Sequence, residues 1–316
     1  MKAGRIHAYG GPEQLVYEDA PQPHTVKNQV LIRVYAAGVT PTELSWSTTW
    51  KTKTGADRLL PVIPGHELRG VVSEVSPGVD DDLSVGSEVY GLTDFTRDGT
   101  AAEYTIAQPT EITFKPNSID HVHAAAAPLD ALTAWQALFD HAHLTSGQRI
   151  LIHGAAGGIG TYAVQLARWA GAFVIGTAST KNMDFLSELR VDSMIDYTAV
   201  RFDDAVNDVD IVLDAVGGET LKRSVRVLRP GGRLISVVEE PSLEALKEAS
   251  ERGIIPPTFF IVEPNRIQLT RIGNLIDAGH ITPIVDSVFS LSNVREAYEG
   301  GKGTHTHGKM VLKIAD

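Results

Sequence analysis

Three small residues near the middle of the chain have the spacing of a phosphate-binding turn. Residues 148–171 read QRILIHGAAGGIGTYAVQLARWAG, where the apolar run 150–152 predicts a buried strand and the later residues repeat apolar positions at helical spacing. Ala155, Gly157 and Gly160 occupy the positions of G-x-G-x-x-G between strand and helix. Glycine lets a pyrophosphate approach the backbone, and the helix N-terminus supplies free N–H groups. The turn, with Gly158 and Ile159, predicts a dinucleotide-binding site; the alternative is a tight turn without a ligand.

The segment after the next predicted strand, 173–177, indicates which dinucleotide is bound. Residues 178–182 contain Ser179, Thr180 and Lys181 but no carboxylate. An acidic residue about twenty positions beyond the glycines would hold a ribose 2′-hydroxyl, whereas a 2′-phosphate requires hydrogen-bond donors and positive charge. The sequence therefore predicts NADP(H) rather than NAD(H). A solvated lysine in the first turn of a helix is the alternative for Lys181.

Composition narrows the functional class. The chain has 316 residues, enough for two domains, and its 43% hydrophobic and 21% charged residues are ordinary for a globular protein. It has no cysteine, which excludes disulfides and thiolate chemistry. The net charge of −11 disfavours general binding to nucleic acid or anionic membranes, and no apolar run is long enough to span a bilayer. We expect a cytoplasmic protein with a small-molecule substrate and neither nucleic-acid nor membrane partners.

The predicted secondary structure changes twice along the chain, from β-rich to alternating strands and helices and back to β-rich. Residues 1–120 have the short apolar runs and turn signals of a β-rich domain, with strands predicted at 30–36, 70–75, 87–90 and 102–106. Residues 121–262 alternate strands and helices, which predicts a doubly wound parallel sheet. Its further strands are expected at 194–197, 210–215, 233–238 and 258–262. After a helix at 264–279, β character returns at 285–289 and 309–314, so residues 263–316 are expected to rejoin the first domain.

Several sequence blocks resemble one family in the same order. They are GGPEQL, VLIRVYAAGV, PGHELRGVV, AAEYTIA, PLDALTAWQAL, HGAAGGIG, LRPGGRLIS and GKMVLKI. Together they are similar to the zinc-free quinone oxidoreductase group, which includes zeta-crystallin, of the medium-chain dehydrogenase/reductase superfamily. The resemblance implies an α/β protein with a GroES-like catalytic domain and a Rossmann NADP-binding domain, and a homodimer. It also implies NADPH-dependent hydride transfer to a quinone; the alternatives are an enone or enoyl-thioester reductase and a non-catalytic NADPH-binding sensor.

The resemblance also bears on zinc. Zinc enzymes of the superfamily carry cysteines where this chain has Thr40 and Leu129, while the histidine–glutamate pair remains as His66 and Glu67. One ligand pair cannot close a tetrahedral site. We expect no metal, and we expect His66 to be a hydrogen-bonded structural histidine.

The resemblance assigns further positions. Thr133 would reach the nicotinamide, and Ser179, Lys181 and Tyr197 would form the adenosine-phosphate pocket. The other implied cofactor contacts are Ala215, Val216, Gly217, Val237, Val238, Phe260, Val262 and Lys309. Asp214 is expected to be structural. At the substrate end the sequence departs from the family, because a loop rich in tryptophan follows Thr40. We expect the acceptor to lie against Thr40, Trp46 and Trp50, although the tryptophans could equally pack the domain. The catalytic residues stay unknown, with Thr40 and Tyr104 as candidate proton donors.

Overall fold

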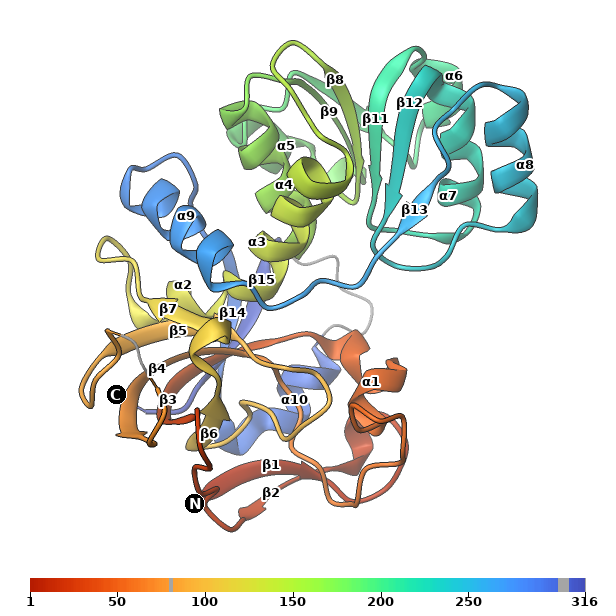
Figure 1. Cartoon of the computed structure of the whole chain (residues 1–316). Helices are drawn as coiled ribbons and strands as arrows, with labels where there is room; N and C mark the ends of the chain where they lie inside the picture. The colour runs from red at the N-terminus through yellow and green to blue at the C-terminus, as the bar shows by residue number, and fades with distance from the viewer. Residues whose placement is uncertain (80–81, 301–306, 316) are drawn as a thin grey trace. The chain divides into compact units, whose positions relative to one another are not determined.

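The computed structural model describes residues 1–79, 82–300 and 307–315, and the chain divides into two compact units. Unit 1 comprises Met1–Leu132 and Glu263–Asp316, drawn from red to yellow and in blue in Figure 1. Unit 2 comprises Thr133–Val262, drawn from green to cyan. Residues 121–132, which the sequence analysis assigned to the dinucleotide domain, are part of unit 1.

Unit 1 is built on a seven-stranded sheet and a two-stranded ribbon. The sheet order is β14-β15-β3-β4-β5-β7, with β6 paired to β3, and the ribbon joins β1 to β2. Most neighbours are antiparallel, while β14 and β15 are parallel, so the C-terminal segment completes a sheet begun by the first part of the chain. The strands are β1 (Lys2–Ile6), β2 (Leu15–Asp19), β3 (Val30–Val39), β4 (Glu67–Val75), β5 (Glu88–Leu92), β6 (Tyr104–Ala107), β7 (Ile112–Phe114), β14 (Val285–Ser290) and β15 (Lys309–Lys313).

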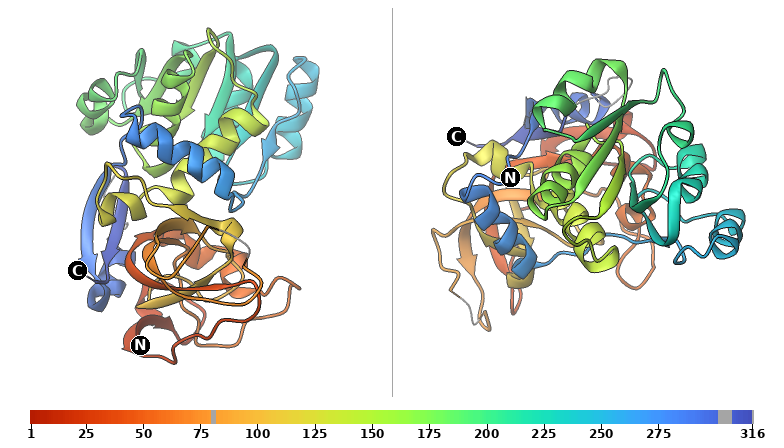
Figure 2. Two further views of the ribbon diagram at one scale, coloured as in Figure 1. Left: turned by 60° about the vertical axis from the view of Figure 1, so that its left-hand side comes forward. Right: turned by 90° about the horizontal axis from the view of Figure 1, so that it is seen from above.

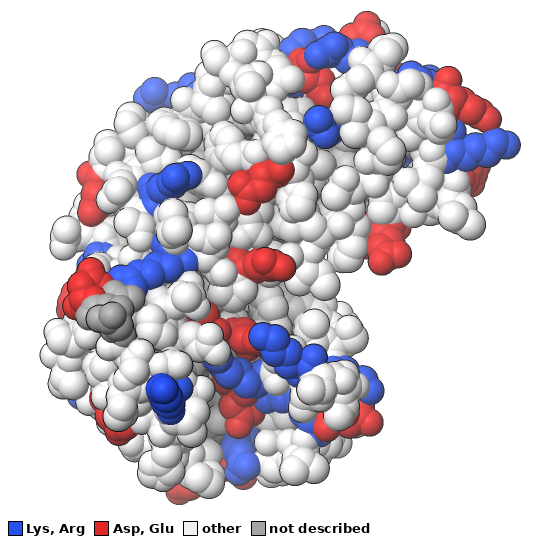
Figure 3. Space-filling model, in the orientation of Figure 1, with Lys and Arg blue, Asp and Glu red and all other residues white. Residues whose placement is uncertain are grey.

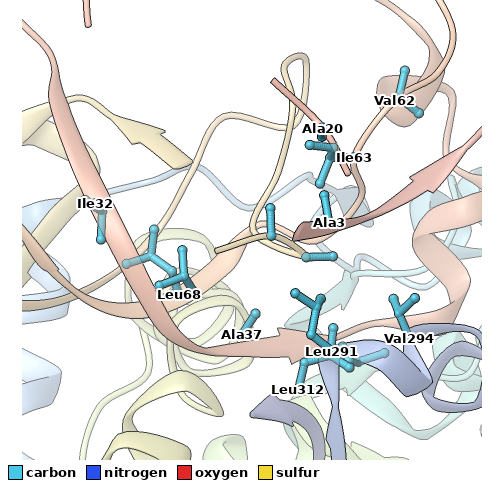
Figure 4. Packing of buried hydrophobic residues seen from close by; sticks show 14 of the residues in the cluster. Ala3, Ala20, Ile32, Ala37, Val62, Ile63, Leu68, Leu291, Val294 and Leu312 are labelled. Atoms are coloured by element: carbon cyan, nitrogen blue, oxygen red, sulfur yellow. The ribbon is translucent and has the colours of Figure 1, made fainter. Parts of the chain in front are cut away.

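The helices of unit 1 are short. Helix α2 packs against β3 and β4, and α9 packs against β7. Figure 4 shows how side chains from distant segments, such as Ile32, Leu68 and Leu312, meet in one apolar core. The α-helices are α1 (Ser47–Trp50), α2 (His121–Ala125), α3 (Pro128–Trp135), α9 (Arg266–Asp277) and α10 (Val294–Glu299), and the 3-10 turns are η1 (Pro12–Gln14), η2 (Pro41–Ser45), η3 (Pro109–Glu111) and η7 (Leu291–Asn293). Helix α3 continues into unit 2 as a π-helical segment, η4 (Gln136–His141).

Unit 2 is a six-stranded sheet in which all neighbours are parallel. Its order, β10-β9-β8-β11-β12-β13, is 3-2-1-4-5-6 in chain order, which is the Rossmann topology. The prediction of a doubly wound parallel sheet is confirmed. The strands are β8 (Arg149–His153), β9 (Phe173–Ala178), β10 (Ser193–Asp196), β11 (Val209–Asp214), β12 (Leu228–Ser236) and β13 (Thr258–Phe259).

Helices follow most of these strands, as right-handed crossovers between parallel strands require. Helix α4 packs against β8 and β9, and α7 packs against β11 and β12, as Figures 1 and 2 show. The helices are α4 (Gly158–Trp169), α5 (Met183–Glu188), α6 (Phe202–Ala205), α7 (Gly218–Ser224) and α8 (Leu243–Glu251), with 3-10 turns η5 (Thr180–Asn182) and η6 (Val225–Val227).

Two predicted strands of unit 2 are too long. Strand β12 ends at Ser236, because the Ser236 hydroxyl donates to the Glu239 carbonyl at 2.7 Å and turns the chain. Strand β13 covers only Thr258–Phe259 instead of 258–262. It pairs with a neighbour on one side only, and Ile261 is exposed. Residues 237, 238, 260 and 262 therefore lie in loops.

The surface agrees with the composition. Among the described residues, none of the helices combines the length and the apolar character that a membrane crossing needs. On the face drawn in Figure 3, acidic and basic side chains are interspersed. Mixed charge of this kind does not form the concentrated basic area that a polyanion requires.

Candidate functional site

The glycine turn of unit 2 lies between β8 and α4, at the point where the strand order reverses. Gly154 has a φ of +71°, and Gly157 is the N-cap of α4 in an extended conformation. A Cβ on Gly160 would lie 2.1 Å from the Gly154 carbonyl oxygen, so this position must be glycine for the helix to pack on the turn. A Cβ on Gly157 would meet only one atom, at 3.4 Å. Gly157, Gly158 and Ile159 are also partly exposed, so the fold leaves this side of the turn open.

A row of buried polar side chains crosses the sheet at the same edge. Thr177, His153, Asp214 and Ser236 are register partners on β9, β8, β11 and β12. All four are less than 4% exposed. Because carboxyl ends of parallel strands share one edge, the row supports the loops that follow these strands.

The histidine in this row is neutral. His153 Nδ1 lies 3.1 Å from the Thr177 hydroxyl and Nε2 lies 3.1 Å from the Ser224 hydroxyl. Burial lowers the pKa of His153 to about 3. Since the Ser224 hydroxyl donates to the Thr220 carbonyl, it accepts from His153 Nε2, which leaves Nδ1 to accept from Thr177. His153 thus connects β8 and β9 to α7.

We expect His153 to make folding stability dependent on pH. The unfolded chain protonates this histidine near its ordinary pKa of 6.5, whereas the folded protein does so only near 3. The unfolded state therefore binds more protons, and the stabilisation by His153 is lost as the pH falls from about 6.5 toward 3. The free-energy cost of His153→Asn, measured by urea denaturation, should shrink as the pH falls from 7.5 to 4.5.

His143→Asn is the matched control for this prediction. His143 is exposed and has a φ of +53°, a conformation that asparagine tolerates. The free-energy cost of His143→Asn should therefore be small at every pH. The measured quantity must be the difference in unfolding free energy between variant and parent. The buried Glu43 and Glu67 have raised pKa values, so they make the parent less stable as the pH rises from about 4.5 to 7, opposite to the effect of His153. A constant cost for His153→Asn would contradict the prediction.

The loops after β11 and β12 are held together by carboxylates. Asp214 Oδ1 accepts from the backbone N–H groups of Val216 at 2.8 Å and Gly217 at 3.1 Å. Glu239 accepts from the Gly218 N–H at 2.6 Å. The side chains of Val216 and Val238 are 51% and 49% exposed, which leaves apolar surface on both loops. The loops carrying the expected residues 215–217, 237 and 238 are thus ordered at the carboxyl edge. Their supports, His153, Ser236 and Glu239, were missed by the sequence analysis.

The end of β9 carries the predicted adenosine-phosphate residues. Ser179 is 7% exposed, and within the described part of the chain its hydroxyl has no hydrogen-bond partner. Lys181 is exposed, and Tyr197, 48% exposed, bonds through its N–H to the Ala178 carbonyl at 3.1 Å. Residues 179, 181 and 197 therefore gather where β9 and β10 end.

One carboxylate at this place was not foreseen. Asp196, the last residue of β10, accepts from the Thr180 hydroxyl at 2.5 Å and from the Thr198 hydroxyl at 2.6 Å. These hydroxyls lower the pKa of Asp196, so it carries a negative charge. Asp196 lies outside residues 178–182, where the sequence pattern places the discriminating acid, but strand pairing brings it beside Ala178.

The other expected cofactor residues are spread over both units. Thr133 is 4% exposed inside α3, and Val262 is 8% exposed. The ring of Phe260 lies 4.3 Å from that of His141. Lys309 belongs to unit 1.

Oxygen atoms from β4, from helix α3 and from the residue after β3 surround the Lys309 ammonium at the start of β15. Strand β3 pairs with β15 through Val39 and Met310, and with β4 through Gly38 and Glu67. Lys309 Nζ lies 2.5 Å from Glu67 Oε2, 2.7 Å from Thr40 Oγ1 and 3.4 Å from Asp130 Oδ1. A Cβ on Gly38 would lie 2.5 Å from Glu67 Oε2, so glycine leaves the space for this carboxylate. Lys309, Glu67, Asp130 and Thr40 are called the lysine cluster below.

Burial controls the protonation of the lysine cluster. Lys309, Glu67 and Asp130 are each 4% exposed or less. Burial raises the pKa of Glu67 to about 7 and also raises the pKa of Asp130, although Lys309 opposes both shifts. Burial alone would lower the pKa of Lys309, but the two carboxylates outweigh it and leave that pKa raised. Two carboxyl groups therefore share one firmly protonated lysine, and the pair retains a further proton more readily than free carboxylates do.

A second buried group surrounds Glu43. Its carboxylate accepts from the Tyr298 hydroxyl and from the Gly65 N–H at 3.1 Å, and His66 Nε2 lies 3.7 Å from it. Burial raises the pKa of Glu43 to about 7 and lowers that of His66 to about 3. His66 Nδ1 is 3.5 Å from the Thr93 hydroxyl, while Nε2 has no hydrogen-bond partner among the described residues. His66 is thus buried, but its hydrogen bonding is weaker than we expected for a hydrogen-bonded structural histidine.

The side chains at the zinc-ligand positions do not fit a zinc ion. Thr40 Oγ1 already accepts from the Lys309 ammonium, and a cation beside that ammonium would be repelled. Leu129 offers no ligand atom. In the described ranges, no group of three or more His, Cys, Asp and Glu side chains could hold a metal ion.

The candidate acceptor residues have different surroundings. Trp50 is 9% exposed, its indole N–H donates to the Leu44 carbonyl at 3.1 Å, and its ring lies 4.7 Å from that of Tyr9. Trp46 is half-buried and meets Phe95 edge-on at 5.8 Å. Trp50 therefore packs unit 1, and Trp46 has the more accessible ring.

The two candidate proton donors are far apart. Tyr104 lies opposite Arg33 near the start of β3, whereas Thr40 follows the end of β3. Thr40 lies seven positions after Arg33, which corresponds to roughly 23 Å at the usual rise.

Comparison with known proteins agrees with both folds. Residues 26–117 match the alcohol dehydrogenase GroES-like domain, and residues 189–312 match a family described as zinc-binding dehydrogenase. The quinone oxidoreductase of Homo sapiens is 30% identical over 329 residues, covering 99% of this chain and 98% of the relative. The chloroplastic NADPH-dependent alkenal/one oxidoreductase of Arabidopsis thaliana is 32% identical over 324 residues, covering 99% of this chain and 79% of the relative.

A solved structure extends the likeness to three dimensions. The quinone oxidoreductase from Coxiella burnetii has a TM-score of 0.90 and 31% sequence identity, covering 99% of each chain. The likeness therefore extends over nearly the whole chain. It includes both the GroES-like fold of unit 1 and the Rossmann-like fold of unit 2. The chain belongs to the medium-chain dehydrogenase/reductase superfamily, alongside its quinone oxidoreductases, and is an oxidoreductase enzyme.

Proposed function

We propose that this oxidoreductase works without zinc and transfers hydride from NADPH to a quinone or a similar conjugated carbonyl. The observation that carries the proposal is the open, glycine-capped N-terminus of α4 at the switch point of a 3-2-1-4-5-6 sheet. Backbone N–H groups there suit a pyrophosphate. Zinc independence is supported by Lys309, whose ammonium lies against Thr40.

NADPH is supported by the end of β9. Ser179 offers a buried hydroxyl without a partner among the described residues, and Lys181 offers an exposed positive charge two residues later. Asp196 opposes an added phosphate by its charge, but Thr180 and Thr198 occupy both of its oxygens. The hydroxyl and the cation therefore outweigh the carboxylate in this proposal.

Lys181→Ala should weaken NADPH binding by roughly 10- to 100-fold and leave NADH binding nearly unchanged. A charge-assisted hydrogen bond is worth about 1.5–3 kcal/mol, and about 1.4 kcal/mol is a factor of ten. Titration calorimetry with both cofactors measures the difference. Lys247→Ala, at an exposed lysine of α8, is the control and should change neither affinity. An equal loss of affinity for NADPH and NADH would show that Lys181 is not part of the phosphate pocket. Asp196→Asn, which removes the opposing charge, should shift the preference further toward NADPH.

The acceptor class is tested by turnover. After treatment with a chelator, oxidation of NADPH and NADH is compared with 9,10-phenanthrenequinone and with a linear enone. Chelator-resistant, NADPH-dependent quinone turnover supports the proposal. Turnover of the enone alone favours an alkenal or enone reductase, the activity named for the Arabidopsis relative. Tight NADPH binding without any turnover favours a sensor. The homodimer and the cytoplasmic location stay predictions.

A further inference from the structure

The Thr40 hydroxyl differs from the rest of the lysine cluster in accessibility. Thr40 is half-buried, whereas Lys309, Glu67 and Asp130 are enclosed. Thr40 is therefore the member of the lysine cluster that lies partly at the surface of unit 1, while the ammonium is enclosed. Thr40 stands at the end of β3, immediately before η2, and although it is the N-cap of that turn its side chain makes no cap bond.

The hydrogen of this hydroxyl is available. Thr40 Oγ1 accepts from the Lys309 ammonium at 2.7 Å, so one lone pair is used and the O–H must point elsewhere. Within the described ranges, no acceptor takes that hydrogen. An ammonium behind a hydroxyl oxygen makes the hydroxyl a better hydrogen donor, because it stabilises the negative charge left on oxygen.

The groups behind Thr40 can replace a lost proton. The three hydrogens of the Lys309 ammonium have three oxygen neighbours, on Glu67, Thr40 and Asp130. Asp130 Oδ2 is buried and has no partner among the described residues, which leaves room for a proton on this oxygen. An unbroken series of contacts thus runs from the buried carboxyl groups, through the ammonium, to the hydroxyl of the half-buried Thr40.

We propose that Thr40 is the proton donor to the oxygen anion that hydride transfer creates on a conjugated carbonyl, with Lys309 as its positioning residue. Hydride arrives at the acceptor with its electron pair, and the carbonyl oxygen becomes an enolate or hydroquinone anion. The Thr40 O–H bond breaks as the new O–H bond forms on the acceptor. Lys309 returns a proton to Thr40 Oγ1, and the Glu67–Asp130 carboxyl pair returns one to Lys309 before solvent restores it. This inference rests on the proposed function.

Other acidic groups of unit 1 are less suited to this role. Tyr298 is 1% exposed and donates to Glu43. His66 is 2% exposed and neutral. Tyr104 is half-buried, but it lies on β6, distant from the lysine cluster. The charged groups of that cluster therefore do not act on its hydroxyl. Thr40 combines a half-buried position with contact to a buried proton supply.

The test is a series of acceptors graded by the basicity of the anion they form. Thr40→Val, which keeps the shape and removes the hydroxyl, should lower kcat for a linear enone by about 10²- to 10⁴-fold, the usual contribution of general acid catalysis. For quinones with electron-withdrawing groups, whose anions are weak bases, the loss should be much smaller. KM and NADPH affinity should change little, and Thr40→Ser should restore most of the rate. Thr42→Val, at an exposed threonine two residues away, is the matched control.

The outcomes separate the two proposals. A uniform loss for all acceptors, or no loss, would overturn the assignment of Thr40 while leaving the oxidoreductase proposal intact. A parent enzyme that binds NADPH but reduces no acceptor would overturn the proposed function itself. A measurement without any variant is the solvent isotope effect on kcat of the parent enzyme, which should be larger for the enone than for the electron-poor quinone. Equal isotope effects would also overturn the assignment.

Discussion

Gly157→Val will abolish binding of both NADPH and NADH while leaving the melting temperature of the protein nearly unchanged. A Cβ at position 157 would meet only the Gly154 carbonyl oxygen, at 3.4 Å, and the extended backbone there is open to residues other than glycine. The fold therefore tolerates valine. A bound pyrophosphate must approach this backbone closely, and the valine side chain would occupy that space. Fluorescence titration with each cofactor and thermal denaturation measure the two effects.

Gly160→Ala is the matched comparison, and it should lower the stability of the protein, which Gly157→Val should not. Its Cβ would lie 2.1 Å from the Gly154 oxygen and 2.7 Å from Ala155 Cα, both backbone atoms of the turn. Overpacking of this sort costs about 1–3 kcal/mol. The melting temperature should fall. Normal cofactor binding by Gly157→Val would show that the turn holds no dinucleotide.

Lys309→Met will destabilise unit 1 strongly near neutral pH. The substitution keeps an unbranched side chain of similar length but leaves Glu67 and Asp130 buried without their cation. Breaking a buried ion pair by removing one partner costs about 3–5 kcal/mol. The cost should decrease as the pH falls from 8 to 5, because protonated carboxyl groups need no counter-charge.

Urea denaturation at several pH values measures this loss. Lys313→Met, at the exposed end of the same strand, is the control, and its effect should stay within about 0.5 kcal/mol at each pH. If Lys309→Met were no more costly than Lys313→Met, the ammonium would not be held in the lysine cluster. A large loss that did not change with pH would contradict the protonation described for Glu67 and Asp130.

Local pattern was enough to predict the elements that carry the candidate site. The apolar run of β8, the glycines and the helical repeat of α4 are adjacent in the chain, so their order alone indicates a strand, a turn and a helix. The alternation that follows predicted the parallel sheet of unit 2. Sequence reasoning was less accurate where strands end, as at Ser236 and Phe259, because a side-chain hydrogen bond or a missing neighbour decides those positions.

Contacts between distant segments were not predictable in the same way. Asp196 follows Thr180 by sixteen residues, and only the pairing of β9 with β10 brings its carboxylate to that hydroxyl. His153 and Ser224 are 71 residues apart, and the path of α7 over β11 joins them. No local composition signals such partners.

The sequence by itself determined the two kinds of fold, the place of the glycine turn between β8 and α4 and the lack of cysteine ligands, because each depends on residues close together in the chain. Tertiary structure alone decided the surroundings of Thr40 and Lys309, which are separated by 269 residues. Their meeting requires β15 to return to the sheet and pair with β3, while β4 supplies Glu67 on the other side. Burial within that sheet then sets the protonation of the carboxyl groups. Residue types name the possible donors and acceptors, but sheet register determines which of them meet.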